Sequence, residues 1–291
     1  MAITLFKKPD FGGESLKVTR NFSDLKDTAV KNSTSSAKMT SSSDMALFFK
    51  DKNWKGGVMF RNGKEEISNM SSAKHGGKFG FGDTVSSVRI TPFKVRLFVN
   101  VIQDDDGNLP GGVSSKSKAE KLVGDIVADA NKVWEDGLLK MEVAEIVFRK
   151  SSKYFDMKGE LVSLLLKDWN KAGHINVYFI NEMQESKSAS KKGLDKNGIS
   201  VTCALPVIAA WRGAVVELGD DSTPVSSKIP QLGRTFAHEI GHYLGLGHSK
   251  DTSNFMDTKG AGAGRAISEG QAEEVQIHLS KNIFVKGLRV D

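Results

Sequence analysis

The sequence predicts two domains: an all-β Greek-key sandwich in residues 1–92 and an α/β domain in residues 93–291. Three observations predict this. The first third has short β-branched and aromatic runs separated by Gly, Ser, Asn and Asp, and it contains an internal repeat. The remainder alternates strand-like and helix-like apolar patterns, which indicates a mainly parallel sheet covered by helices. At 291 residues, the chain is long enough for each part to bury a core.

The internal repeat consists of an aromatic residue, four residues, a second aromatic residue, one residue and a glycine. It occurs at Phe6, Phe11 and Gly13 and again at Phe49, Trp54 and Gly56. A serine pair follows each copy. Aromatic side chains packed over a glycine-hinged hairpin are typical of a Greek-key sandwich in which each copy supplies half of the core. On these residues, positions 1–92 resemble a βγ-crystallin domain.

Members of that family often bind calcium through two acidic or amide residues, two variable residues, then Ser or Thr and Ser. Ca²⁺ prefers such hard oxygen ligands. The resemblance therefore implies two calcium sites, one with Asn32 and Ser35 and one with Asp83 and Ser86. Each segment lacks the first acidic or amide residue. The alternative is that the serines only form hydrogen bonds that close a turn.

The second part begins with apolar residues that alternate with others over 95–101, which predicts a strand that ends at the turn 104–108. Helical spacing over 122–134 predicts a long amphipathic helix that stops at Gly137. Further strands are expected over 141–148, 175–180, 198–204 and 213–218, and a shorter helix over 159–170. Apolar positions at Ala272, Val275 and Leu279 predict a closing helix.

One more helix is expected over 231–244, with Ser226 or Ser227 and Pro230 as start signals. His238 and His242 lie four residues apart, so they project from one face of that helix and can hold one metal ion. Gly245 can adopt a positive φ at little cost, which lets the helix end and the chain turn back.

His248 then returns as a third imidazole ligand. Three histidines with an open fourth position are what a catalytic zinc site requires, the open position holding a water molecule. Glu239, beside the first histidine, is the candidate general base.

At these residues the chain resembles the metzincin metallopeptidases, whose pattern His-Glu-x-x-His-x-x-Gly-x-x-His is matched in full over 238–248. Those enzymes carry a methionine turn beneath the metal, and Met256 follows at a suitable distance. Ser249 and the spacing to Met256 are most similar to the matrixins. Thr258 stands where other metzincin groups carry a tyrosine ligand, so no tyrosine ligand is expected.

The resemblance implies a zinc endopeptidase that acts on a protein or peptide substrate. In metzincins the strand corresponding to 198–204 runs antiparallel at the edge of the sheet and pairs with an extended peptide. Ile199 and Val201 are therefore expected along the substrate. The glycine-rich stretch 259–265 is expected to shape one wall of the specificity pocket.

The composition limits the classes of protein to which the chain can belong. The chain has 39% hydrophobic and 26% charged residues, as ordinary globular proteins do, and no apolar run long enough for a membrane span. The net charge of +6 comes from residues 1–93, which hold 15 basic and 9 acidic side chains. Without a basic cluster interleaved with aromatics, a solvated lysine-rich surface is favoured over nucleic-acid binding.

The single cysteine, Cys203, excludes an intramolecular disulfide. We interpret it as a strand residue; the alternative is an inhibitory zinc ligand, but the propeptide motif that surrounds such a cysteine is missing. No secretory signal is visible, yet matrixin-like enzymes are usually exported, so we expect a secreted or exported monomer. A second hypothesis is a calcium-dependent surface- or ligand-binding protein whose metallopeptidase domain is latent.

Overall fold

The computed structural model describes residues 3–31, 33–73, 81, 85–158, 168–184, 198–200, 213–219, 225–257, 264–281 and 289–290. The chain divides into two compact units. Unit 1 comprises Met1–Phe93, Glu135–Leu138 and Ile267–Asn282, and unit 2 comprises Lys94–Trp134, Leu139–Ala266 and Ile283–Asp291. The predicted division into residues 1–92 and 93–291 stays a prediction, since unit 1 also takes two later segments of the chain. The closing helix was expected in the second domain, but it belongs to unit 1 together with the N-terminal strands.

Unit 1 contains two antiparallel sheets that enclose a core. One sheet has the order β2-β1-β3-β6, formed by Ser15–Val18, Ile3–Phe6, Ser36–Met39 and Glu65–Ile67. The other has the order β5-β4-β7, formed by Lys55–Asn62, Met45–Asp51 and Ser87–Arg89. Buried side chains from both sheets, among them Leu5, Phe48 and Met59, form one cluster. The predicted all-β sandwich is confirmed.

The two repeats exchange strands. β6, from the second repeat, pairs with β3 of the first. Phe22, from the first repeat, pairs with Val88 in β7 of the second through two backbone hydrogen bonds of 2.8 and 2.9 Å. Each sheet thus contains chain from both halves, which is the Greek-key connection that the repeat predicted.

The corner of each repeat is closed in the same way. The hydroxyl of Ser36 accepts a hydrogen bond from the Phe11 N–H and donates to the Lys8 carbonyl. The hydroxyl of Ser87 does the same with the Trp54 N–H and the Asp51 carbonyl. Gly13 and Gly56 have φ of 76° and 77°, a left-handed conformation that favours glycine. The second serine of each pair therefore has a structural role.

Unit 2 is built on a mixed sheet with the order β13-β14-β11-β8-β15, and β9 also pairs with β8. These strands are Gly198–Ser200, Gly213–Glu217, Ile175–Ile180, Phe93–Gln103, Arg289–Val290 and, for β9, Leu139–Lys150. β8, β11 and β14 run parallel, whereas β13 is antiparallel to β14 at the edge. The predicted parallel arrangement is therefore found for the three central strands, whereas the sheet as a whole is mixed because β13 and β15 pair antiparallel at its edges.

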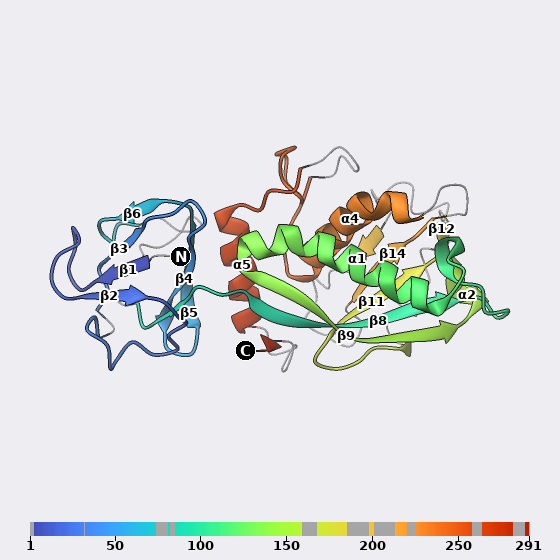
Figure 1. Cartoon of the computed structure of the whole chain (residues 1–291), viewed down its shortest axis with the longest axis horizontal. Helices are drawn as coiled ribbons and strands as arrows, with labels where there is room; N and C mark the ends of the chain where they lie inside the picture. The colour runs from blue at the N-terminus through green and yellow to red at the C-terminus, as the bar shows by residue number, and fades with distance from the viewer. Residues whose placement is uncertain are drawn as a thin grey trace. The chain divides into compact units, whose positions relative to one another are not determined.

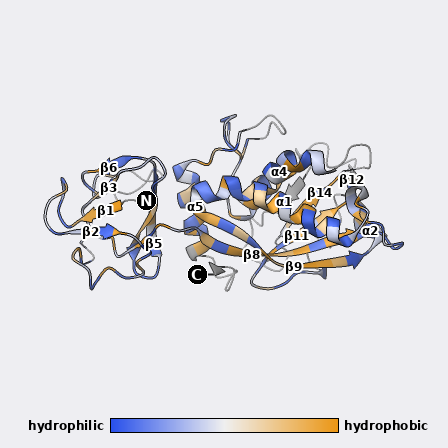
Figure 2. Cartoon of the chain, viewed as in Figure 1, coloured by the Kyte–Doolittle hydropathy of each residue, from blue (hydrophilic) through white to orange (hydrophobic). Residues whose placement is uncertain are grey.

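Two helices, α1 (Lys116–Trp134) and α4 (Ile229–Tyr243), pack against each other, and α4 also packs on β14 and β13 (Figure 1). Most buried positions of α1 are apolar, as the helical spacing predicted, with Asp129 and Asn131 as exceptions, and most of its exposed positions are polar (Figure 2). Edge-to-face aromatic contact between Trp134 and Phe255, with ring centroids 5.1 Å apart, joins α1 to the segment after α4.

The shorter elements of unit 2 are η1 (Pro110–Gly112), α2 (Ser152–Phe155) and η6 (Val225–Lys228). β10 (Asp156–Lys158) and β12 (Glu182–Gln184) form a parallel pair. Unit 1 also contains η2 (Glu135–Gly137) and α5 (Glu269–Lys281). The helix expected over 159–170 lies almost entirely outside the described residues. Among the helices that the structure describes, none combines the length and hydropathy that crossing a bilayer requires.

Candidate metal centre

The helix α4 carries the first two histidines. Pro230 lies in its first turn, where a missing N–H is tolerated, as predicted. Ser226 and Ser227, the other predicted start signals, lie in a 3₁₀ turn over Val225–Lys228 directly before α4, and the N-cap is Lys228, without a side-chain hydrogen bond. At the other end, Gly245 has φ of 95°, and its N–H donates to the carbonyl of His242 at 3.0 Å.

The reversal at Gly245 brings His248 back to the two helical histidines. The candidate ligand nitrogens of His238, His242 and His248 all lie within 4.8 Å of one another. Nε2 of His242 and Nε2 of His248 are 3.0 Å apart. Two nitrogens bound to one tetrahedral zinc ion lie about 3.3 Å apart, so this pair already has nearly the spacing that a shared ion needs.

The orientation of two rings is fixed by backbone carbonyls. Nδ1 of His238 lies 3.0 Å from the Phe255 carbonyl, and Nδ1 of His242 lies 2.8 Å from the Leu246 carbonyl. A carbonyl can only accept, so each Nδ1 must carry the proton and each Nε2 has a lone pair for a metal. Such outer contacts orient metal-binding imidazoles and make them stronger ligands.

Glu239 follows His238 directly and lies three residues before His242, so its side chain projects beside the face that the two histidines share. Only 3% of its surface is exposed. A carboxylate in such surroundings interacts strongly with nearby charge because little water screens it.

The methionine turn lies against the middle of α4. Met256 is fully buried, and its side chain packs on Gly241, which lies between the two histidines. A Cβ on Gly241 would lie 2.4 Å from the Met256 sulfur. The Asn254 side chain accepts a hydrogen bond from the Met256 N–H at 2.9 Å, and the Ser249 N–H donates to the Met256 carbonyl at 2.9 Å. The turn is thereby joined to the residue that follows His248, through the isolated bridge between Ser249 and Asp257.

A buried arginine that the motif does not contain also holds this turn. Arg234, one helical turn before His238, donates to the Asp257 carbonyl at 2.8 Å and to the Phe255 carbonyl at 3.4 Å. It also donates to the Gly264 carbonyl at 3.4 Å. The Phe255 carbonyl is the one that fixes His238. A lone arginine within a helical pattern gives no sequence signal of this role, so sequence reasoning missed it.

The donor set fits zinc. Three imidazoles, two of them held as the Nδ1–H tautomer, are neutral nitrogen ligands of the kind that catalytic zinc sites use. Among the described residues, the chain therefore offers three histidine ligands to one ion.

The other expected site residues are only partly described. Ile199 lies in β13 at the edge of the sheet, opposite Val215, whereas Val201 and Cys203 lie outside the described residues. Asn32 and Asp83 also lie outside them. The Ser35 hydroxyl donates to the Lys7 carbonyl at 3.0 Å. The Ser86 N–H and carbonyl bond with Phe49 and Leu25. Calcium binding stays a prediction.

A mixed sheet, a helix with two histidines in adjacent turns and a third histidine after a glycine turn together define a metallopeptidase domain. The sequence model of the Matrixin peptidase family matches residues 104–264, more than half of the chain. The chain belongs to the matrixin family. No curated protein gives a significant match to the sequence.

Solved structures resemble both parts of the chain. A βγ-crystallin from Ciona intestinalis has 26% sequence identity, and the match covers 31% of this chain and 100% of that one with a TM-score of 0.26. A βγ-crystallin from an archaeon has 24% identity over 31% of this chain and 95% of that one, with a TM-score of 0.25. Mirolysin in complex with compound 9 has 14% identity over 69% of this chain and 100% of that one, with a TM-score of 0.45.

Proposed function

We propose that the chain is a zinc-dependent endopeptidase in which Glu239 is the general base. The observation that carries the proposal is the convergence of three imidazoles, all within 4.8 Å, beside a buried carboxylate on the same helix. This arrangement supplies a metal site and a proton acceptor together, which peptide hydrolysis requires.

His238, His242 and His248 would hold the ion through Nε2, since Nδ1 of the first two is committed to backbone carbonyls. When bound, zinc supplies a Lewis acid that lowers the pKa of water and stabilises negative charge on a carbonyl oxygen. The backbone contacts of the two helical histidines hold the rings in one orientation through turnover.

Glu239 accepts a proton from the attacking water at one carboxylate oxygen and later delivers it to the departing amine nitrogen. The water oxygen forms a bond to the peptide carbon, the C–N bond breaks, and the amine leaves in its protonated form. Burial of Glu239 excludes competing water, which strengthens its interactions with the reacting atoms.

The edge strand β13 supports the choice of a peptide substrate. Its antiparallel pairing with β14 leaves the other edge of β13 as the end of the strand order. An extended peptide can add to such an edge through backbone hydrogen bonds, with Ile199 and Val201 alongside it.

The test compares Glu239→Gln, His242→Ala and the exposed control Glu120→Gln as purified full-length proteins. Zinc content and cleavage of denatured casein are measured for each. We expect Glu239→Gln to keep about one zinc per chain and to lose at least about a hundredfold in turnover. His242→Ala should lose both, and Glu120→Gln neither. Wild-type cleavage by zinc-loaded Glu239→Gln would falsify the general-base role.

A further inference from the structure

The carboxyl-terminal helix α5 packs on β5 of the N-terminal sandwich, within unit 1. It begins about twenty residues after His248 in the sequence, beyond the end of the Matrixin match at residue 264. Its start is well defined, because Ser268 and Gln271 form a reciprocal capping box: each backbone N–H donates to the other side chain, at 3.0 and 3.3 Å.

The strand β5 is an edge strand with both faces buried. Met59 points into the sandwich core, whereas Val58 and Phe60, on the opposite face, are also buried. An antiparallel sheet usually exposes one face to water, so this second buried face needs a cover. α5 is the described helix that packs there, and its buried apolar residues are only Ala272 and Val275.

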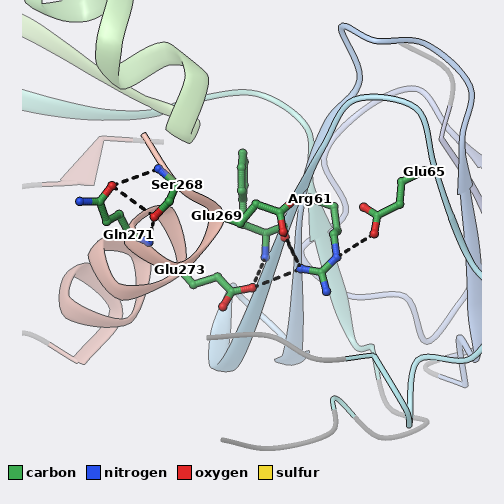
Figure 3. Close-up of polar contacts among 7 residues, drawn as sticks. Arg61, Glu65, Ser268, Glu269, Gln271 and Glu273 are labelled. Atoms are coloured by element: carbon green, nitrogen blue, oxygen red, sulfur yellow. Dashed lines mark hydrogen bonds and ion pairs between the residues drawn. The ribbon is translucent and has the colours of Figure 1, made fainter. Parts of the chain in front are cut away.

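A carboxylate completes the edge of the strand. The Phe60 N–H donates to Oε1 of Glu273 at 3.0 Å, so the side chain of α5 occupies the place of a neighbouring strand's carbonyl (Figure 3). Only 2% of the Glu273 side chain is exposed. Ile277 and Leu279 of α5 are also half-buried, and this buried polar contact stabilises the packing of the helix on β5 further.

Beside Phe60, the guanidinium of Arg61 contacts three carboxylates. Arg61 Nε lies 3.2 Å from Oε1 of Glu65, and Arg61 Nη1 lies 3.4 Å from Oε2 of Glu269 and 3.5 Å from Oε1 of Glu273 (Figure 3). If all three acids ionise, the buried Glu273 lies in a cluster with an excess of negative charge, although Glu65 and Glu269 are partly exposed. A proton relieves that excess.

Arg61 and Glu269 act directly on the Glu273 carboxyl, and the elements near it carry further titratable groups. β5 supplies Arg61, β6 supplies Glu65, and α5 supplies Glu269, Glu274 and His278. The η2 turn, which packs on α5, supplies Glu135 and Asp136. Burial raises the pKa of Glu273 to about 7, against the opposing effects of the Phe60 N–H and Arg61. Burial also raises the pKa of Glu65 and of Asp136, so these acids shift in the same direction.

We propose that α5 is an acid-strengthened clamp that keeps the N-terminal sandwich attached to the carboxyl-terminal part of the chain, even when the backbone between the two is cut. The sandwich is then a permanent part of the protein and not a prosegment that a cut releases. This inference is independent of peptidase activity.

The direction of the pH effect follows from proton linkage. In the docked state, in which α5 packs on β5, the pKa of Glu273 is raised. The contribution of Glu273 to this packing is therefore fully present below about pH 4.5 and is lost as the pH rises through about 7. A protonated Glu273 still accepts the Phe60 N–H through its carbonyl oxygen. Docking should therefore weaken about tenfold between about pH 6 and about pH 8.

The test places a specific protease site between Thr91, which is exposed, and Pro92 in the full chain. The uncut protein must first show the wild-type melting temperature. After cleavage, we expect the two fragments to co-elute in gel filtration at about pH 6, with a dissociation constant that rises about tenfold at about pH 8. Glu273→Gln should abolish that pH dependence, and the exposed neighbour Glu274→Gln should keep it.

Hydrogen exchange of the uncut wild-type protein provides a second readout that needs no insertion. Protection factors for peptides of β5 should fall about tenfold between the same two pH values, and Glu273→Gln should remove the change. Fragments that separate at both pH values would overturn the clamp. A β5 pH response that persists in Glu273→Gln would overturn the role of Glu273.

Discussion

At the residue scale, Arg234 and His238 share the Phe255 carbonyl. Nδ1 of His238 donates to this oxygen at 3.0 Å, and the Arg234 guanidinium, one turn earlier in α4, donates to it at 3.4 Å. Arg234 also donates to the Asp257 carbonyl. The arginine therefore fixes the methionine turn, and through it the ring that would bind the metal.

Arg234→Met should lower the free energy of unfolding by about 2 kcal/mol, because buried carbonyls lose a charged donor. Metal release to a chelator should also become faster, since His238 loses part of its support. Thermal melting and stopped-flow chelation measure the two effects. The matched control is Arg96→Met at an exposed position. If the two variants behave alike, Arg234 does not position the site.

The local geometry of the site could be predicted where a residue type at a given spacing has one conformational consequence. The three histidines are together, and Gly245 has the left-handed conformation that ends α4. Arg234 could not be predicted, because its partners are backbone carbonyls of a segment about twenty residues later. Backbone acceptors have no identity in a sequence, so no pattern indicates which carbonyls a buried arginine will meet.

At the element scale, the contact between α1 and α4 depends on a glycine. Gly233 in α4 lies against Asp129 of α1, and a Cβ at Gly233 would lie 2.7 Å from the Asp129 Cβ. Asp129 is itself held by Arg265 at 2.6 Å. This close approach places α4, and with it the two helical histidines.

Gly233→Ala should destabilise the protein by about 1–3 kcal/mol, because overpacking forces the two helices apart. Gly124→Ala is the matched change in α1, where an added Cβ meets nothing within 4 Å. It should stabilise the protein by up to about 1 kcal/mol through helix propensity. Urea unfolding measures both, and equal effects of the two substitutions would contradict the packing argument.

Most elements were predictable because their apolar pattern is strong, as in the helical spacing of α1 and the continuous apolar run of β11. The partner of α5 was not, because its stripe of Ala272 and Val275 is compatible with many surfaces. A signal was present in the strands. Residues 46–49 and 58–60 are continuously apolar instead of alternating, which indicates strands buried on both faces. That pattern implies a cover such as α5 but does not say which segment supplies it.

At the scale of the whole molecule, we expect metal binding and folding to be linked. An ion that binds only the folded chain stabilises it by mass action. In the described chain the three histidines join α4 to the segment after Gly245, so an ion would cross-link two parts of unit 2.

Removal of metal with 1,10-phenanthroline should lower the melting temperature and abolish peptide cleavage, and zinc should restore both. Glu239→Gln should show the same thermal response without cleavage, because it retains the ligands. His242→Ala should show neither response, and magnesium should not replace zinc. A melting temperature that changes with neither chelator nor zinc would contradict the linkage between metal binding and folding.

The most direct test of the central claim is X-ray absorption at the zinc edge on the purified protein. Binding by His238, His242 and His248 predicts only nitrogen and oxygen neighbours at about 2.0–2.1 Å, with imidazole outer-shell scattering that diminishes in His242→Ala. A sulfur neighbour at about 2.3 Å would identify Cys203 as a ligand. That result, or a spectrum unchanged by His242→Ala, would contradict a centre of three histidines with an open position for catalysis.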